Sequence, residues 1–138
     1  MIIDNNLLLD DGVSIDVGDA AQVSTYSVDM GAARKIGAGK QMYVIIVIDV
    51  VFATSTSVNF QVVTDTVATL ASPTVQIETG AIAIASLTAG RAPIVIPIGS
   101  AIGTQEQYLG LQYTVAGATG TGTVTAFIAF DYQSNWGE

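Results

Sequence analysis

Residues 42–52, which read MYVIIVIDVVF, form the most apolar and most β-branched stretch of the chain. A membrane-spanning helix needs about 20 apolar residues, so this stretch is too short to cross a bilayer as a helix. Val, Ile, Tyr and Phe fit the packed surface of a sheet, and no helix cap stands at either end. The stretch therefore predicts a buried β-strand.

The two faces of this predicted strand differ. The even positions are all apolar: Val44, Ile46, Ile48, Val50 and Phe52. The odd positions are Tyr43, Ile45, Val47, Asp49 and Val51, and they carry one charge, that of Asp49. We therefore predict that the even face lies in the domain core. An antiparallel strand with one wet face normally alternates apolar and polar residues. The odd face is too apolar for that, so we expect another part of the chain or another subunit to cover it.

Length and composition favour one folded domain with an unusually uncharged surface. A chain of 138 residues needs no second core, and it buries roughly two-thirds of the surface that its unfolded form exposes. Hydrophobic residues make up 50% of the chain and charged residues only 12%. A monomer with so few charges is prone to self-association. We therefore expect an oligomer or a large partner.

The charge balance argues against nucleic acid as a partner. The net charge is −8 and the sequence pI is about 4.1, whereas nucleic-acid binding draws most of its affinity from Lys and Arg. Only four basic residues are present, and Arg34, Lys35 and Lys40 sit close together. Such a cluster is typical of a solvated loop, or it provides a local contact for an acidic partner surface.

The residue inventory excludes several kinds of chemistry. The chain has no His and no Cys, which rules out Ser-His-Asp catalysis, Cys-His catalysis and ordinary zinc sites. No pair of carboxylates is singled out as the pair that a glycosidase needs. The acidic residues fall mostly in predicted loops and near the N-terminus, and we interpret them as solubilising charge. We predict no catalytic residue, no cofactor and no metal site.

The opening segment predicts neither export nor a membrane partner. Its first residues, MIIDNN, lack the basic and long apolar regions of a secretory signal, so we expect assembly in a cytosol. Residues 1–12 read MIIDNNLLLDDG, and they do not have the alternating oxygen ligands and closing Glu of a calcium loop. We predict that they form an N-terminal arm or a first edge strand.

A glycine-rich segment before the central strand also fails as a ligand-binding loop. Residues 31–40 read GAARKIGAGK and end like a phosphate-binding loop. Arg34 stands where the first Gly of that motif belongs, and a predicted strand follows where a helix should begin. Turn chemistry accounts for these glycines.

Short predicted strands follow one another along the rest of the chain. They cover residues 22–30, 57–64, 74–79, 81–87, 92–98, 108–116 and 123–132, with turns predicted at 53–57 and 117–122. Pro93 and Pro97 make the strand at 92–98 an edge strand. Alternation places these side chains in the core: Val58, Phe60, Val62, Val75, Ile77, Ile94, Ile96, Ile98, Leu109, Leu111, Tyr113, Val115, Val124, Ala126, Ile128 and Phe130. With no convincing helix, the pattern predicts an all-β, single-domain antiparallel β-sandwich, a jelly roll of about eight strands.

Several stretches carry a resemblance to a known family. They are the opening MIID with its Leu-Leu-Asp run, VDMGAARKIGAGKQMYVIIV, ASPT with TGAIAIASLTAG, and YLGLQYTVAGATGTGTVTAFIAFD. In this order they resemble the jelly-roll capsid cement, or head decoration, proteins of short-tailed bacteriophages. The tail SNWGE departs from that pattern.

The resemblance implies a structural protein of the virion, assembled in the host cytoplasm. It implies a protein that coats the outer capsid surface, bridges neighbouring copies of the phage major capsid protein and associates with itself as a dimer or trimer. No catalytic residue is carried over. An acidic, weakly charged β domain agrees with such a role.

Segments at the ends and in the basic loop are the candidates for capsid or subunit contacts. The candidate residues are Ile2, Ile3, Leu7, Leu8, Leu9, Arg34, Lys35, Lys40, Tyr43 and Trp136. Trp136 either packs on its own domain, within a C-terminal tail at about 133–138, or anchors in a partner pocket. Two alternative functions stay open: a glycan-binding jelly-roll module that uses exposed aromatics such as Tyr132 and Trp136, and a phage tail or baseplate component.

Overall fold

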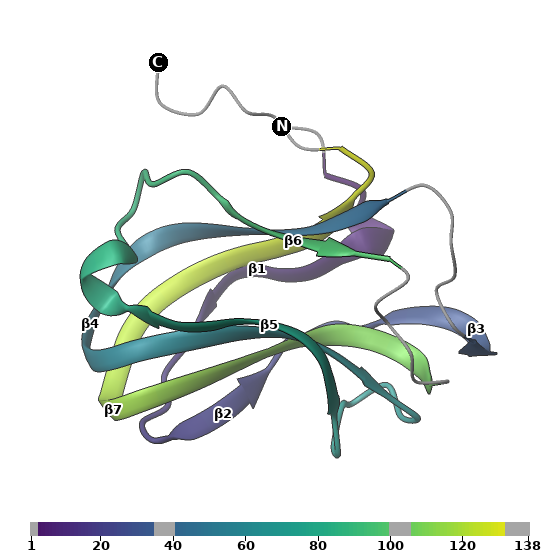
Figure 1. Cartoon of the computed structure of the whole chain (residues 1–138), viewed down its shortest axis with the longest axis horizontal. Coiled ribbons are helices and arrows are strands. Elements are labelled where there is room, and N and C mark those ends of the chain that lie inside the picture. Colours follow the sequence, from purple (N-terminus) through teal and green to yellow (C-terminus); the bar gives the residue numbers. More distant parts are fainter. Residues whose placement is uncertain (1–2, 35–40, 100–105, 132–138) are drawn as a thin grey trace.

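The computed structural model describes residues 3–34, 41–99 and 106–131, which fold into strands joined by short connections (Figure 1). In chain order the elements are η1 (Asn5–Leu7), β1 (Leu8–Ser14), β2 (Ala20–Val23), β3 (Val28–Arg34), β4 (Met42–Asp65), β5 (Thr74–Ala83), η2 (Ile84–Ser86), β6 (Ile94–Ile98) and β7 (Glu106–Ala129). Both η elements are short 3-10 turns, and no α-helix occurs in these ranges. The all-β prediction is confirmed.

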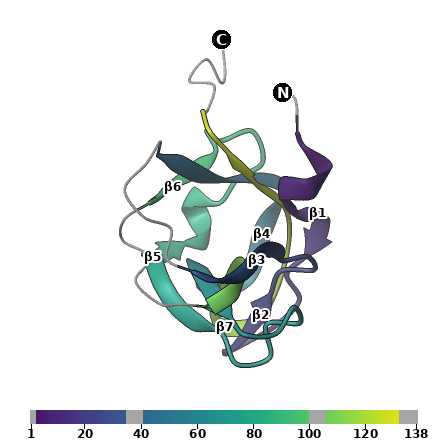
Figure 2. The same ribbon diagram turned by 90° about the vertical axis from the view of Figure 1, so that its right-hand side faces the viewer.

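The strands form two half-sheets that share the long strands β4 and β7 (Figure 2). The first half-sheet has the order β6-β4-β7-β1. The second has the order β5-β4-β7, followed by β2 and β3, which lie one after the other along the same edge of β7. All pairings are antiparallel, and each long strand passes from one layer into the other. When β4 and β7 are counted in both layers, and β2 and β3 are counted as one broken strand, this is the strand order of an eight-stranded jelly roll.

β4 and β7 are each continuous where the sequence predicted two strands and a turn. The predicted turns lie opposite each other instead, since Ser55 pairs with Gly117. Thr54 has a φ of 68° and Gly117 a φ of 94°, and the register between the strands shifts repeatedly here. Left-handed residues and bulges bend a strand without ending it. The small residues therefore form a corner at which the paired strands fold over together.

Some predicted strand boundaries and core positions were also wrong, because strands continue, break or end against the local sequence pattern. β5 runs through Gly80, which the sequence suggested as a break, and residues 22–30 are divided into β2 and β3 by a link at 24–27. Val75 is 43% exposed beside a register shift between β4 and β5. Phe130 is 54% exposed, because β7 ends at the preceding residue and leaves it without a sheet neighbour.

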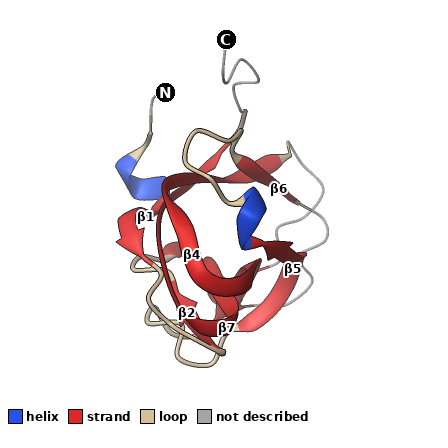
Figure 3. Ribbon diagram, turned by 90° about the vertical axis from the view of Figure 1, so that its left-hand side faces the viewer, coloured by secondary structure: helices blue, strands red, loops and turns tan. Residues whose placement is uncertain are grey.

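The core lies between the two half-sheets and otherwise follows the predicted alternation. Its buried members include Val44, Ile46, Ile48, Phe52, Val58, Phe60, Val62, Ile94, Ile96, Ile98, Leu109, Leu111, Tyr113, Val115, Val124, Ala126 and Ile128. Val50 is the exception on the even face, because a register shift beside it leaves it 50% exposed. η2 leads from β5 towards β6 (Figure 3), and the carbonyl of the buried Leu87 accepts a 3.1 Å hydrogen bond from the Phe52 N–H.

The ring of Phe52 packs directly on Gly122, which gives a test of the corner. A Cβ added at Gly122 would lie 2.6 Å from Cγ of Phe52. Replacing Gly122 with alanine overpacks this contact, so we expect the free energy of unfolding to fall by about 1–3 kcal/mol. Gly99→Ala is the matched control, since a Cβ there meets nothing within 4 Å. Urea denaturation of both variants measures the difference, and equal stabilities would contradict this packing.

Candidate functional site

The outward-facing side of the first half-sheet carries a row of apolar side chains on each strand, and we call this set the outer apolar face. It consists of Leu8, Tyr43, Ile45, Val47, Val51, Val95, Pro97, Phe127 and Ala129. The strand register aligns its central row, because Ile45 pairs with Val95 on one side and with Phe127 on the other, and Phe127 pairs with Leu8. The face therefore crosses all four strands of this half-sheet.

Part of the outer apolar face is covered by the chain itself, and part is open. Ile45 is 1% and Phe127 2% exposed, although neither belongs to the main core cluster. Val51 is 46% exposed. The carboxylate of Asp49 accepts a 2.7 Å hydrogen bond from Oγ1 of Thr125, so the single charge of the odd positions is held at the surface. We expected the odd face of β4 to need a cover. The chain itself buries Ile45, but it leaves Val51 open.

The outward side of the second half-sheet is polar by contrast. One carboxylate oxygen of Glu78 accepts hydrogen bonds from the side-chain amides of Asn59, at 2.8 Å, and Gln61, at 2.9 Å. These two bonds lower the pKa of Glu78. The Thr114 hydroxyl donates to the side-chain amide oxygen of Gln61, Oε1, at 2.7 Å. A polar ladder of this kind is satisfied by its own members, so the two outer sides of the sandwich differ in polarity.

The loop after β4 is fastened by a single carboxylate. Although desolvation raises the pKa of Asp65, hydrogen bonds from the backbone N–H groups of Ser72, Val67 and Thr66 outweigh it and lower the pKa. The loop brings Leu70 over Gly110 of β7 and buries it to 2% exposure. This carboxylate is structural and not solubilising, which corrects the interpretation from sequence.

The N-terminal contact candidates are only partly available. Ile3 is 38% exposed and Leu8 is half-buried, but Leu9 is fully buried in the core and Leu7 packs against it. Residues 8–12 belong to the edge strand β1, so the edge-strand alternative holds for them and the arm does not extend to residue 12. Leu9 was wrongly proposed as a contact, because pairing of β1 with β7 draws it inside.

Of the other candidates for capsid or subunit contacts, Arg34 and Tyr43 lie in later strands, and the rest lie outside the described residues. Tyr43 is half-buried on the outer apolar face. Arg34 is the last residue of β3, and its backbone lies opposite Glu106. Candidates outside the described residues are Ile2, Lys35, Lys40 and Trp136, together with Tyr132 of the glycan alternative.

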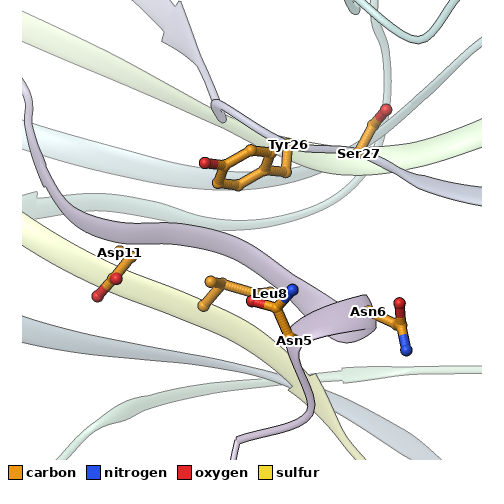
Figure 4. Close-up of a pocket in the computed structure, with 6 residues that line it drawn as sticks. All are labelled: Asn5, Asn6, Leu8, Asp11, Tyr26 and Ser27. Atoms are coloured by element: carbon orange, nitrogen blue, oxygen red, sulfur yellow. The ribbon is translucent and has the colours of Figure 1, made fainter.

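A polar groove that the sequence did not predict lies between the start of the chain and the link from β2 to β3. Its volume is about 400 Å³, and its lining residues are Asn5, Asn6, Leu8, Asp11, Tyr26 and Ser27. Figure 4 shows the ring of Tyr26 on one side and Asn5, Leu8 and Asp11 on the other. We call it the Tyr26 groove. Local pattern gave no signal for it, because its two walls are distant in sequence and meet only in the fold.

A buried carboxylate holds the two walls of the Tyr26 groove together. Asp10 is fully buried and accepts a 2.5 Å hydrogen bond from the Tyr113 hydroxyl and a 2.7 Å bond from the backbone N–H of Thr25. Burial raises the pKa of Asp10, and these hydrogen bonds offset part of that rise. Burial and the adjacent carboxylate raise the pKa of Tyr113 well above its usual value. Asp10 is therefore a structural bridge between β1, β7 and the β2–β3 link.

The described ranges contain neither a metal-binding cluster nor a membrane-spanning helix. No group of three or more His, Cys, Asp or Glu side chains within them is placed to hold a metal ion. No helix found in the same ranges is long and apolar enough to cross a membrane.

The fold and its surfaces define a jelly-roll sandwich protein with one apolar and one polar outer side. Comparison with family models then places it: residues 15–128 match the model of the Bbp16 family, and the chain belongs to that family. The family name is that of a phage-related protein. No curated protein matches the chain.

Proposed function

We propose that this protein is a capsid cement, or decoration, protein that binds the outer surface of a phage head and bridges neighbouring major capsid proteins. The observation that carries the proposal is the outer apolar face, a nearly uncharged set of side chains that crosses one half-sheet and is open to solvent at Val51 and Pro97. Membership of a phage-related family supports it. Contiguous apolar surface on a folded domain marks a binding surface for another macromolecule.

The make-up of the face suits a protein partner. Protein interfaces are depleted of charge at their centre and enriched in aromatic residues, with a polar rim. The accessible part of the outer apolar face includes the half-buried aromatic Tyr43, and the hydrogen-bonded Asp49–Thr125 pair provides a polar margin. Its cross-strand hydrogen bonds make it rigid, so little conformational entropy is lost on binding.

Binding of this kind stabilises a shell by linkage. A protein that binds assembled capsid but not dissociated subunits shifts the equilibrium towards the assembled state by mass action. If each cement unit contacts two capsomers, its second contact is effectively intramolecular, so modest interfaces give lasting attachment. A dimer or trimer of this chain provides such a double contact, and symmetric homo-oligomers are the common form of soluble assemblies.

The basic loop is a second proposed contact. Arg34, Lys35 and Lys40 carry three of the four positive charges of a chain whose net charge is −8. If they face an acidic capsid surface, reversing the charges of Arg34 and Lys35 weakens attachment and reduces its sensitivity to salt. Unchanged occupancy of the shells would remove this loop from the contact.

Mixing the purified protein with shells that lack it tests the proposal. We expect stoichiometric sedimentation with the shells and a higher rupture temperature, because the bound protein must be released before the shell opens. A protein left in the supernatant beside unchanged shells would contradict the cement function. Sedimentation with isolated tails instead would favour a tail or baseplate component.

A further inference from the structure

We propose that the Tyr26 groove binds a neutral saccharide, with the Tyr26 ring as a platform and Asn5, Asn6 and Asp11 as hydrogen-bonding groups. This binding is a separate activity from attachment to a shell. It uses the edge of the sandwich where η1 and β1 meet the β2–β3 link, and it shares only Leu8 with the outer apolar face.

Most polar side chains of the groove are available to a ligand. Within the described residues, no hydrogen bond engages the side chains of Asn5, Asn6, Asp11 or Tyr26. An amide side chain offers donors and an acceptor, and a carboxylate offers acceptors only. Sugar hydroxyls both donate and accept, so a saccharide can use all of these groups at once. A Lys or Arg side chain has no acceptor and would leave the amide donors unused.

The apolar part of the groove suits the C–H face of a sugar ring. Tyr26 is 55% exposed, and its ring faces the wall that carries Leu8 (Figure 4). A pyranose ring has one face made largely of C–H groups, which packs on an aromatic ring, while its hydroxyls point outward at the edge. An aromatic residue with a few convergent polar groups is the usual make-up of a small-ligand site.

The charge and the volume of the groove restrict the class of ligand further. Asp11 lies in the groove and Asp4 caps η1 beside it, with no basic residue in the lining, so anionic sugars and phosphates are repelled. The volume of about 400 Å³ lies within the range of roughly 300–1,000 Å³ typical of small-molecule sites. One or two neutral sugar units are therefore the class of ligand that fits.

The groove is preformed, because its walls are fixed to each other. The Tyr26 N–H donates to the Leu9 carbonyl at 3.0 Å, and the Tyr26 carbonyl accepts a 2.8 Å hydrogen bond from Oγ of Ser24. Asp10 ties the neighbouring Thr25 to β1 from inside. The Ser27 hydroxyl donates to the Ala68 carbonyl at 2.8 Å. A site held in this way loses little entropy when it is filled.

Titration of the 138-residue protein with sugars, without shells, tests this proposal independently of the cement function. The panel contains glucose, galactose, mannose, N-acetylglucosamine and their disaccharides, with glucuronic acid and arginine methyl ester as charged probes. Two-dimensional NMR is the readout. We expect a neutral sugar to shift the backbone amides of Asn6, Asp11 and Ser27. Tyr26→Ala should weaken that binding at least about tenfold, whereas Tyr26→Phe, which keeps the ring, should retain most of it.

The variants separate a lost site from a lost fold. Val75→Glu changes an exposed valine on β5 and should leave sugar binding unchanged, and the NMR spectrum of each variant reports its folding. The proposal is overturned if no neutral sugar binds with a dissociation constant below roughly 10 mM. It is also overturned if Tyr26→Ala folds and binds as the wild type does, or if only arginine methyl ester binds.

Discussion

Replacing Val51 with glutamate is expected to weaken binding to undecorated phage shells by at least about tenfold, or about 1.4 kcal/mol of binding free energy. Val51 is an open part of the outer apolar face, with 46% of its surface exposed. In the proposed complex the new carboxylate would be removed from water without a partner, and an unpaired buried charge is strongly unfavourable. Cosedimentation with shells at several protein concentrations measures the change.

The chain offers a closely matched control for this substitution. Val75 is a valine of nearly the same exposure, 43%, but it lies on β5 in the second half-sheet. Val75→Glu should therefore bind shells like the wild type. If both glutamate variants bind equally well, the outer apolar face is not the shell contact. If Val51→Glu instead abolishes self-association while shell binding is kept, the face joins copies of this chain.

Replacing Asp10 with alanine is expected to lower the free energy of unfolding by about 2–4 kcal/mol at neutral pH. The substitution removes the acceptor of the buried Tyr113 hydroxyl and of the Thr25 N–H. Unsatisfied buried donors keep their full desolvation cost. Asp11→Ala is the control, because the Asp11 carboxylate is adjacent in sequence but exposed. This substitution should change the free energy of unfolding by no more than about 0.5 kcal/mol. Similar losses in the two variants, measured by urea denaturation, would show that Asp10 is not a bridge.

The Asp10 carboxylate also makes the free energy of unfolding depend on pH in a defined direction. Because the pKa of Asp10 is raised in the folded state above its ordinary value of 3.8, the folded protein binds the proton more tightly than the unfolded chain does. Its contribution to stability is therefore largest in acid and is lost as the pH rises through the folded-state pKa. The stability difference between the wild type and Asp10→Asn should fall as the pH is raised from about 4 towards neutrality. A difference that rises over this interval would contradict the burial of the charge.

Local alternation predicted the parts of the fold where the sheet is regular. Phe60 and Tyr113 were both placed inside from sequence, and they meet there with ring centroids 5.8 Å apart at an interplanar angle of 88°. The edge position of the proline-containing β6 and the unusual odd face of β4 were also predicted from residue type. These features depend on period-two patterning, which a sequence shows directly.

Features that depend on bulges or on distant contacts were not predictable. A run such as GATGTG, residues 117–122, is compatible with a hairpin tip or with a bent strand, and only its pairing with residues 53–57 decides between them. A register shift between Leu8 and Asp10 places both Leu9 and Asp10 inside, against simple alternation. The Tyr26 groove forms only when the β2–β3 link lies beside β1, so no single stretch of sequence contains it.

Electron cryomicroscopy of shells with and without the bound protein tests the central claim most directly. We expect additional density on the outside of the shell, into which the jelly roll fits with the outer apolar face, around Tyr43 and Val51, towards the junctions between major capsid proteins. Density in which the polar side around Glu78 meets the shell, or shells without additional density, would contradict it.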